Sequence, residues 1–165
     1  MKTLSIFTIA IAFGFCSQSV FAHQNHIDKK KPAAAAAKEQ KDWGIAGDAA
    51  KVTRTITVAM SDKMRFTPDK IEIKQGETVR IAITNAGTML HEMVIGTKKE
   101  LADHAAMMVK FPNMEHDEPY MAHVPAGKKG EIIWTFNKAG EFEFACLIAG
   151  HYSSGMVGKI MVAVK

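Results

Sequence analysis

The stretch that decides the fold reads Gly140-Glu141-Phe142-Glu143-Phe144-Ala145-Cys146-Leu147-Ile148-Ala149-Gly150-His151-Tyr152-Ser153-Ser154-Gly155-Met156. Its first part alternates aromatic and acidic residues, which predicts a β-strand with both Phe rings in a core. Its second part carries a thiol, an imidazole and a thioether, with four residues between each and the next. Two His and a Cys in a trigonal set with a long axial Met define a mononuclear copper site. We therefore expect Cys146, His151 and Met156 to bind one copper ion, with His91 as the fourth ligand.

Period-two alternation extends over much of the remaining chain and predicts further strands. These runs are 52–58, 71–73, 79–83, 132–136, 141–145 and 157–164. Turn-forming clusters separate them, so seven or eight short strands favour an all-β, Greek-key β-sandwich. One segment differs: around 98–111, apolar residues recur at helical spacing before Pro112, and these residues are Leu101, Ala105, Met108 and Val109. We expect one inserted amphipathic helix there.

The N-terminus has the pattern of a secretory signal peptide, with Lys2, a short apolar run and small residues before a cleavage site. We expect residues 1–22 to be removed after Ala22, and Cys16 with them. Cys146 is then a lone thiol in an exported protein, where no intramolecular disulfide can form. Loss of Lys2 lowers the formal net charge from +4 to +3. This mild charge, with no basic block, predicts no nucleic-acid partner.

Residues 23–50 show little periodicity and contain a run of alanines among charged residues. We interpret them as a flexible tether in which Trp43 alone docks on the folded domain, residues 51–165. Cleavage after Ala22 would make His23 the amino-terminal residue, with His26 three positions later. A copper chelate there and a simple polar tail are both open readings.

The motifs together resemble those of cupredoxins, the type 1 copper proteins. Cys-x4-His-x4-Met after residues 140–145 resembles their ligand loop, with the spacing of rusticyanin-like members. Residues 65–79 resemble the F-x-P-x-x-I-x-I-x-x-G-x-x-V signature, and His91-Glu92-Met93-Val94 resembles the strand with the first histidine. The likeness runs from about residue 52 to the C-terminus and is greatest to small periplasmic copper-resistance cupredoxins.

This resemblance implies a periplasmic blue-copper protein that carries one electron or protects against copper. It also implies a redox partner protein that docks near His151, where 148–150 form an apolar patch. We expect a monomer with no stable membrane insertion after cleavage. We expect no enzymatic activity, because His-x-His pairs for a trinuclear copper centre and a second loop cysteine for a binuclear centre are both missing from the sequence.

Some of these residues could instead have purely structural roles. A lone buried Cys is often a small hydrophobe, and His91 could be a core histidine. A second, Cu(I)-binding site could be built from side chains of the later loop, namely Met114, His116, Met121 and His123. Such a site would favour a copper chaperone or sequestering protein over an electron carrier. His104 is expected to face solvent, and backbone N–H groups of the turn at 84–90 are expected to approach the Cys146 sulfur.

Overall fold

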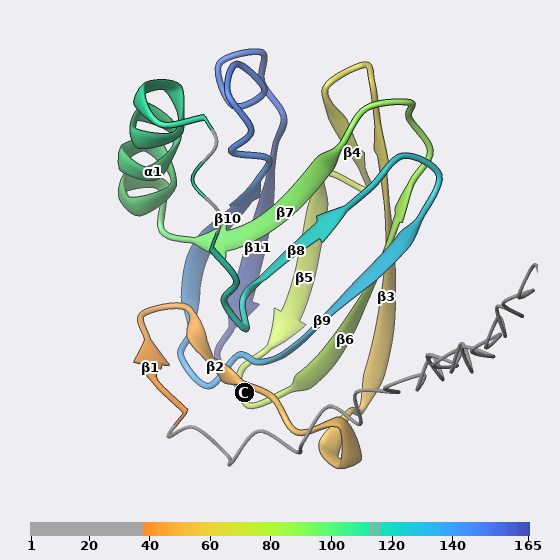
Figure 1. Cartoon of the computed structure of the whole chain (residues 1–165). Coiled ribbons are helices and arrows are strands. Elements are labelled where there is room, and N and C mark those ends of the chain that lie inside the picture. Colours follow the sequence, from red (N-terminus) through yellow and green to blue (C-terminus); the bar gives the residue numbers. More distant parts are fainter. Residues whose placement is uncertain (1–37, 113, 115) are drawn as a thin grey trace, which may run out of the picture. The chain divides into compact units, whose positions relative to one another are not determined.

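The computed structural model describes residues 38–112, 114 and 116–165, which form a sandwich of two β-sheets (Figure 1). The strands of the first sheet, in spatial order, are β1 (Gln40–Lys41), β2 (Gly44–Ala46), β9 (Lys129–Thr135), β6 (Thr78–Asn85), β3 (Arg54–Ser61) and β4 (Arg65–Thr67). Those of the second sheet are β5 (Lys70–Lys74), β11 (Val157–Ala163), β10 (Gly140–Ala145), β7 (His91–Gly96) and β8 (Met121–Val124). The predicted all-β sandwich is confirmed, with eleven strands in the described part rather than seven or eight.

Both sheets are mixed, because neighbours in space are often distant in sequence. Strand β3 pairs in parallel with β6, and β5 pairs in parallel with β11, whereas the other pairs are antiparallel. Strand β10 lies between β7 and β11, with Ala145 opposite both Val94 and Val157. The residue after Ala145 therefore leaves the sheet directly beside the strand that begins at His91.

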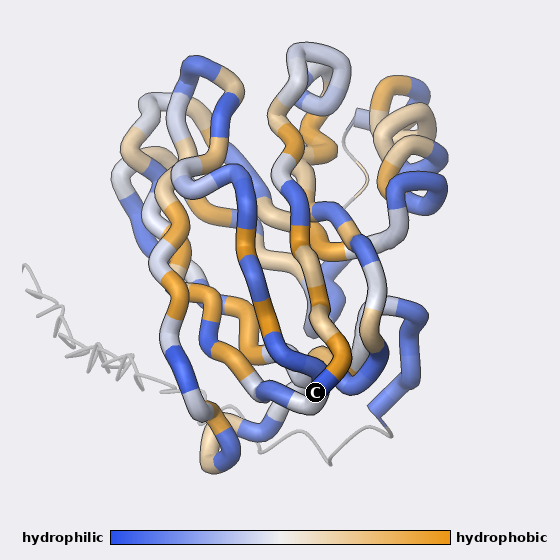
Figure 2. Tube along the Cα trace, turned by 180° about the vertical axis from the view of Figure 1, so that it is seen from behind, coloured by the Kyte–Doolittle hydropathy of each residue, from blue (hydrophilic) through white to orange (hydrophobic). Residues whose placement is uncertain are grey.

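The core lies between the sheets and follows from the alternating pattern (Figure 2). Along β6, the side chains of Val79, Ile81 and Ile83 point inward and are almost fully buried. Phe142 and Phe144 are both buried, as predicted. The ring of Phe144 packs edge-on against Phe66, with 4.9 Å between ring centroids. The two aromatic strand residues therefore anchor the polypeptide immediately before Cys146.

The prediction of a flexible tether through residue 50 is wrong for its described part. Strands β1 and β2 pair with each other, and β2 continues the first sheet by pairing with β9. Trp43 between them is only 3% exposed, and its carbonyl oxygen accepts a 2.9 Å hydrogen bond from Nε1 of Trp134. A short 3₁₀ turn, Ala49–Lys51, then leads into β3. Burial of Trp43 and the pairing of β1 and β2 with the sheet together hold this polar segment in place.

The predicted helix is confirmed as α1, Lys98–Lys110, one residue shorter than expected. Thr97 caps its N-terminus by accepting a hydrogen bond from the Glu100 N–H, and Pro112 follows its C-terminus. Its buried residues are Leu101, Ala105 and Met108. Val109 is 64% exposed, so its assignment to the apolar face was wrong. It lies 100° around the helix from Met108, and that turn carries it out of the interface.

The sandwich has two distinct ends (Figure 1). The loop after β10 and the turn after β6 lie at one end, whereas β1 and the C-terminus lie at the other. The predicted signal peptide, His23, His26 and most of the predicted tether fall outside the described residues. None of the helices in the described part has the length and apolarity to cross a membrane.

Candidate metal centre

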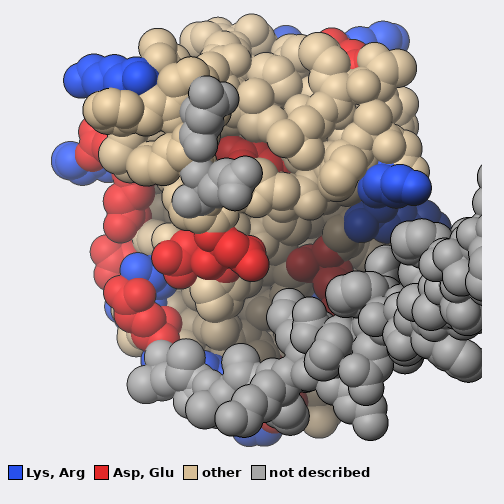
Figure 3. Space-filling model, in the orientation of Figure 1, with Lys and Arg blue, Asp and Glu red and all other residues tan. Residues whose placement is uncertain are grey.

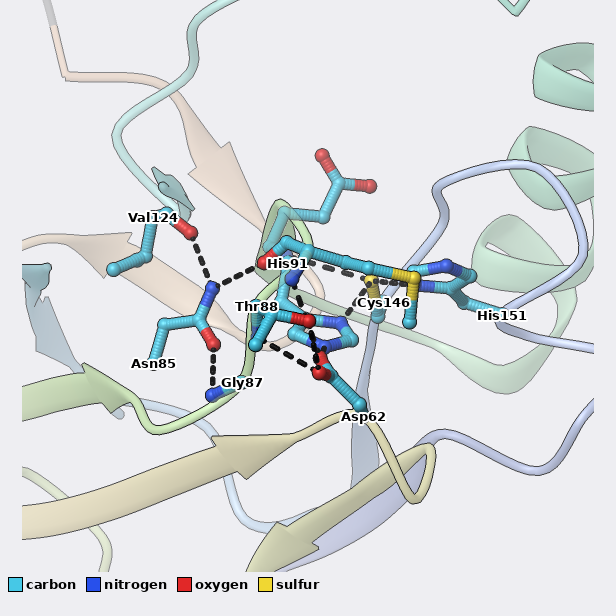
Figure 4. A network of polar contacts seen from close by, with 10 residues as sticks. Asp62, Asn85, Gly87, Thr88, His91, Val124, Cys146 and His151 are labelled. Atoms are coloured by element: carbon cyan, nitrogen blue, oxygen red, sulfur yellow. Dashed lines mark hydrogen bonds and ion pairs between the residues drawn. The ribbon is translucent and has the colours of Figure 1, made fainter. Parts of the chain in front are cut away.

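Three of the four predicted ligands meet at one end of the sandwich. His91 begins β7, Cys146 follows β10, and His151 lies in the loop that joins β10 to β11. Their ligand atoms all lie within 4.8 Å of one another. The Cys146 sulfur is 4.0 Å from Nδ1 of His91 and 3.2 Å from Nδ1 of His151, and Figure 4 shows the three side chains converging. One ion bound to all three atoms would fit between them, because copper–ligand bonds are about 2 Å long.

The three side chains differ in their access to solvent. His91 and Cys146 are fully buried, whereas His151 is partly exposed. An ion held between them would be shielded by the sandwich on most sides, and the ring of His151 would form its link to the surface.

The orientation of His91 is fixed by Asp62, in the turn between β3 and β4. Nε2 of His91 lies 3.0 Å from Oδ1 of Asp62, so Nδ1 faces the sulfur (Figure 4). Asp62 in turn accepts hydrogen bonds from the backbone N–H and the hydroxyl of Thr88, at 2.7 and 2.8 Å. These bonds from Thr88, followed by that to His91, lower the pKa of the Asp62 carboxyl. A carboxylate on the outer nitrogen of a ligand histidine sets the tautomer and raises ligand basicity.

We expect Asp62→Ala to weaken copper binding by about 10- to 100-fold, the range for loss of such an outer partner. Asp62→Asn is the matched variant, because its amide oxygen can still accept the bond from Nε2 but carries no charge. Its copper affinity should lie between those of the wild type and Asp62→Ala. Competition titration against a chelator measures all three, and equal affinities would show that Asp62 does not act on the site.

A backbone N–H also approaches the sulfur, but it comes from outside the predicted turn. The N–H of Glu92 donates to the Cys146 sulfur at 3.4 Å, so the donor follows His91 rather than preceding it in the turn at 84–90. The turn is instead held by Asn85. Its amide donates to the carbonyl oxygens of Met89 and Val124 at 2.7 and 2.8 Å (Figure 4). Asn85 thus fixes the backbone that leads to His91.

Burial raises the pKa of the Cys146 thiol to about 12. Burial, and then the neighbouring His91, lower the pKa of His151, so its imidazole is neutral at and above neutral pH. The metal-free thiol therefore keeps its proton near pH 7, and a metal that binds the thiolate must displace that proton.

Copper affinity should consequently rise with pH. We expect release of one proton per copper and an apparent affinity that increases about tenfold per pH unit between roughly pH 7 and 9. Chelator competition at several pH values measures the slope, and calorimetry in buffers of different ionisation enthalpy counts the proton. An affinity that does not change with pH would contradict a protonated resting thiol.

The loop between Cys146 and Met156 is closed by its own backbone. The N–H of Met156 donates to the His151 carbonyl, and the N–H of Cys146 donates to the Met156 carbonyl, both at 3.1 Å. Gly150 and Gly155 have φ values of +89° and +83°, which glycine adopts without steric cost. Arg65 of β4 donates to the carbonyl oxygens of Ser154 and Gly155. The loop is therefore tied to both sheets.

Met156 is fully buried and belongs to the same core cluster as Cys146. Its position next to the site is compatible with an axial thioether, and its burial is compatible with a core side chain. Its role as the fourth ligand stays a prediction.

The residues of the predicted second site lie apart from the three ligands, along a groove beside α1 with a volume of about 950 Å³. The groove is lined by all four of them, Met114, His116, Met121 and His123, and also by Met108 and Glu92. The prediction that His104 faces solvent is wrong. It is half-buried, and its Nε2 lies 2.5 Å from Nε2 of His116.

Sequence reasoning missed Asp62, Glu92 and His104. A helical-spacing signal existed for His104, since it stands four residues before the buried Met108 on one face of α1. Glu92 stood next to a predicted ligand on an apolar strand, where a carboxylate is unusual. Asp62 had no local signal, because its contact with His91 bridges 29 residues of sequence.

Comparison with known proteins supplies the family. The family model "Copper binding proteins, plastocyanin/azurin family" matches residues 52–163. The copper-resistant cuproprotein CopI of Rubrivivax gelatinosus is 52% identical over 120 residues, which cover 73% of each chain. CopI of Pseudomonas aeruginosa is 35% identical over 96% of this chain and 94% of its own. Auracyanin of Roseiflexus castenholzii shares the fold, with a TM-score of 0.58 and 21% identity over 68% of this chain and 98% of its own.

Proposed function

Because the chain belongs to the plastocyanin/azurin family of copper-binding proteins, we propose that it carries single electrons on one bound copper ion in copper tolerance. The proposed ligands are His91, Cys146, His151 and, axially, Met156. The observation that supports this most directly is the convergence of three donor atoms, from two distant segments, within 4.8 Å in a largely buried pocket. One thiolate and two imidazoles are the donors that a type 1 copper site needs.

The protein's own groups account for the properties that an electron carrier needs. When bound, copper would accept and give up one electron. The sandwich holds His91 and Cys146 through strands β7 and β10, and Asp62 fixes the ring of His91, so the donor atoms are held in place in both oxidation states. The N–H of Glu92 withdraws charge from the sulfur, and the buried pocket excludes water that could act as a further ligand.

A redox partner is proposed to dock at the exposed edge of His151. The neighbouring Ile148 is half-buried, and Leu90, which lines the same groove as Ile148, is 46% exposed. Figure 3 shows few charged side chains at this end of the molecule, whereas acidic residues gather lower on the same face. An apolar patch around an exposed ligand suits a short-lived complex, in which a small contact area keeps dissociation fast.

The copper-resistance relatives indicate an extracytoplasmic protein. The finer assignment is part of the proposal: export to the periplasm, with cleavage after Ala22. The leader pattern and the single thiol that remains after its removal support it. Mass spectrometry of the protein from a periplasmic fraction tests it, and an intact residue 1 in that fraction would contradict cleavage.

The functional proposal is tested by loading the processed chain with Cu(II). We expect one copper per chain at this site, an intense thiolate-to-copper absorption, and reversible reduction and reoxidation by small redox mediators. No enzymatic turnover is proposed. Copper binding without the absorption, or a bound copper that cannot be cycled, would contradict electron transfer.

Met156→Leu should retain copper and alter its redox properties. Loss of the axial ligand lowers the coordination number, which Cu(I) tolerates better than Cu(II), so we expect a higher reduction potential and a changed visible spectrum. Leucine conserves the buried volume, so stability should change little. Voltammetry of the two proteins measures the shift, and an unchanged potential would assign Met156 to the core alone.

A second candidate function, copper storage or delivery, would need a second metal site. The groove beside α1 provides donors for one.

A further inference from the structure

Four polar side chains from four segments form two contacting pairs beside α1, and three of them, Glu92, His116 and His123, line the groove. His104 comes from α1, His116 from the loop after it, His123 from β8 and Glu92 from β7. Nε2 of His104 lies 2.5 Å from Nε2 of His116, and Nε2 of His123 lies 2.8 Å from Oε2 of Glu92. The ring centroids of His116 and His123 are 6.1 Å apart. The two donor pairs therefore lie side by side.

Two atoms of this cluster are buried without a hydrogen bond. Glu92 is fully buried, and its Oε2 makes no hydrogen bond; its polar contact is the ion-pair distance of 2.8 Å to Nε2 of His123. Nδ1 of His116 is also buried and unpartnered. A buried polar atom without a partner costs roughly 1–3 kcal/mol, and more when it is charged. Coordination of a metal ion would give both atoms a bonding partner.

The other wall residues of the groove have structural roles. Met108 and Met121 are about 5% exposed and pack with Leu101 and Leu147 in a satellite core, which explains two of the thioethers. Packing does not explain two imidazoles in contact with each other beside a third that contacts a buried carboxylate. Polar side chains of these types are placed together when they bind each other or a metal, and here the hydrogen bonds are incomplete.

We propose that His104, His116, His123 and Glu92 form a second metal site, which binds Cu(II). Imidazole nitrogen and carboxylate oxygen suit this ion, and among first-row divalent metals it binds such donors most tightly. The site keeps the two histidines of the predicted Met/His site and replaces its thioethers, Met114 and Met121, by His104 and Glu92 as ligands. It contains no thiolate, so copper there lacks the intense colour of the cysteine site.

Glu92 belongs to the surroundings of both sites. Its N–H donates to the Cys146 sulfur, its Oε1 accepts a bond from the Leu147 N–H at 2.9 Å, and its Oε2 faces the groove. A change of Glu92 would therefore disturb both metals, and a selective test must use the histidines instead.

The test compares copper binding by the processed wild type, the groove variant His104→Ala/His116→Ala and the tail variant His23→Ala/His26→Ala. The tail variant removes the same number of imidazoles from the chain. Each protein is titrated with Cu(II), and copper per chain, visible absorption and electron paramagnetic resonance are recorded. We expect wild type to bind a copper beyond the coloured one, with a tetragonal signal split by imidazole nitrogen.

The groove variant should bind one copper fewer than wild type and lose that signal, with its intense absorption unchanged. The unchanged absorption shows that it is folded and leaves the proposed electron-transfer site unaffected. His116→Ala alone, a loop substitution, replaces the double variant if the latter does not fold. Equal stoichiometry in groove variant and wild type, or a second signal lost only in the tail variant, would overturn the proposal.

Discussion

Cys146→Ser is expected to abolish the intense visible absorption of the copper-loaded protein and to weaken its copper binding more than any other single change. The absorption depends on charge transfer from the thiolate to the metal, and a serine hydroxyl has no comparable donor orbital. Serine is also a hard ligand that remains protonated near neutral pH, so the soft, anionic contact is lost. The substitution is nearly isosteric at a fully buried position, so packing should be preserved.

Copper titration followed by visible spectroscopy measures both effects. Ser153→Ala is the matched control, because it changes a hydroxyl in the same loop that donates to the Gly150 carbonyl oxygen and not to a proposed ligand. We expect its spectrum to equal that of the wild type. If Cys146→Ser retained the band, the thiolate could not be its source, and the ligand assignment would fail.

Phe144→Ala should lower the free energy of unfolding by about 3–5 kcal/mol, the usual range for removal of a buried aromatic side chain. Phe144 is fully buried against the ring of Phe66. Opposite it in β11 stands Gly158, where a Cβ atom would lie 2.1 Å from the Phe144 ring. The ring thus occupies space that its cross-strand neighbour leaves open, and its loss leaves a cavity that the rigid sheets fill poorly.

Urea unfolding of the metal-free proteins measures this effect without a contribution from copper binding. Phe111→Ala is the matched control, since the same atoms are removed from a side chain that is 59% exposed, and it should cost less than about 1 kcal/mol. A Phe144→Ala protein within about 1 kcal/mol of wild type would show that the site is free to collapse around the missing ring.

The parts of the fold that could be predicted are those with a local signal. Alternation placed Phe142 and Phe144 in the core, and helical spacing before Pro112 located α1 within one residue. Strands β1 and β2 had no such signal, because they are two and three residues long and their order comes from Trp43. The parallel pairing of β3 with β6 was equally hidden, since register between distant strands is set by the whole core.

The residues of the candidate site also divide into those with a local sequence signal and those without one. Cys146 and His151 were found by spacing within one loop, and His91 by its place on an apolar strand. Their convergence is a property of β7 pairing with β10, which no local pattern encodes. The partners that orient them, Asp62 and the Glu92 N–H, come from tertiary contacts. His104 was misjudged because its polarity was taken for exposure, although it is half-buried against the imidazole of His116.

The placement of the C-terminus has a practical consequence. Because β1 and the C-terminus lie at the end of the sandwich remote from the ligand loop, immobilisation through the last residue would point the histidine edge away from a solid support. A film of such molecules on an electrode, linked through Lys165, would leave the opposite pole open to soluble mediators. The molecule therefore has one end suited to attachment and an opposite end suited to electron exchange.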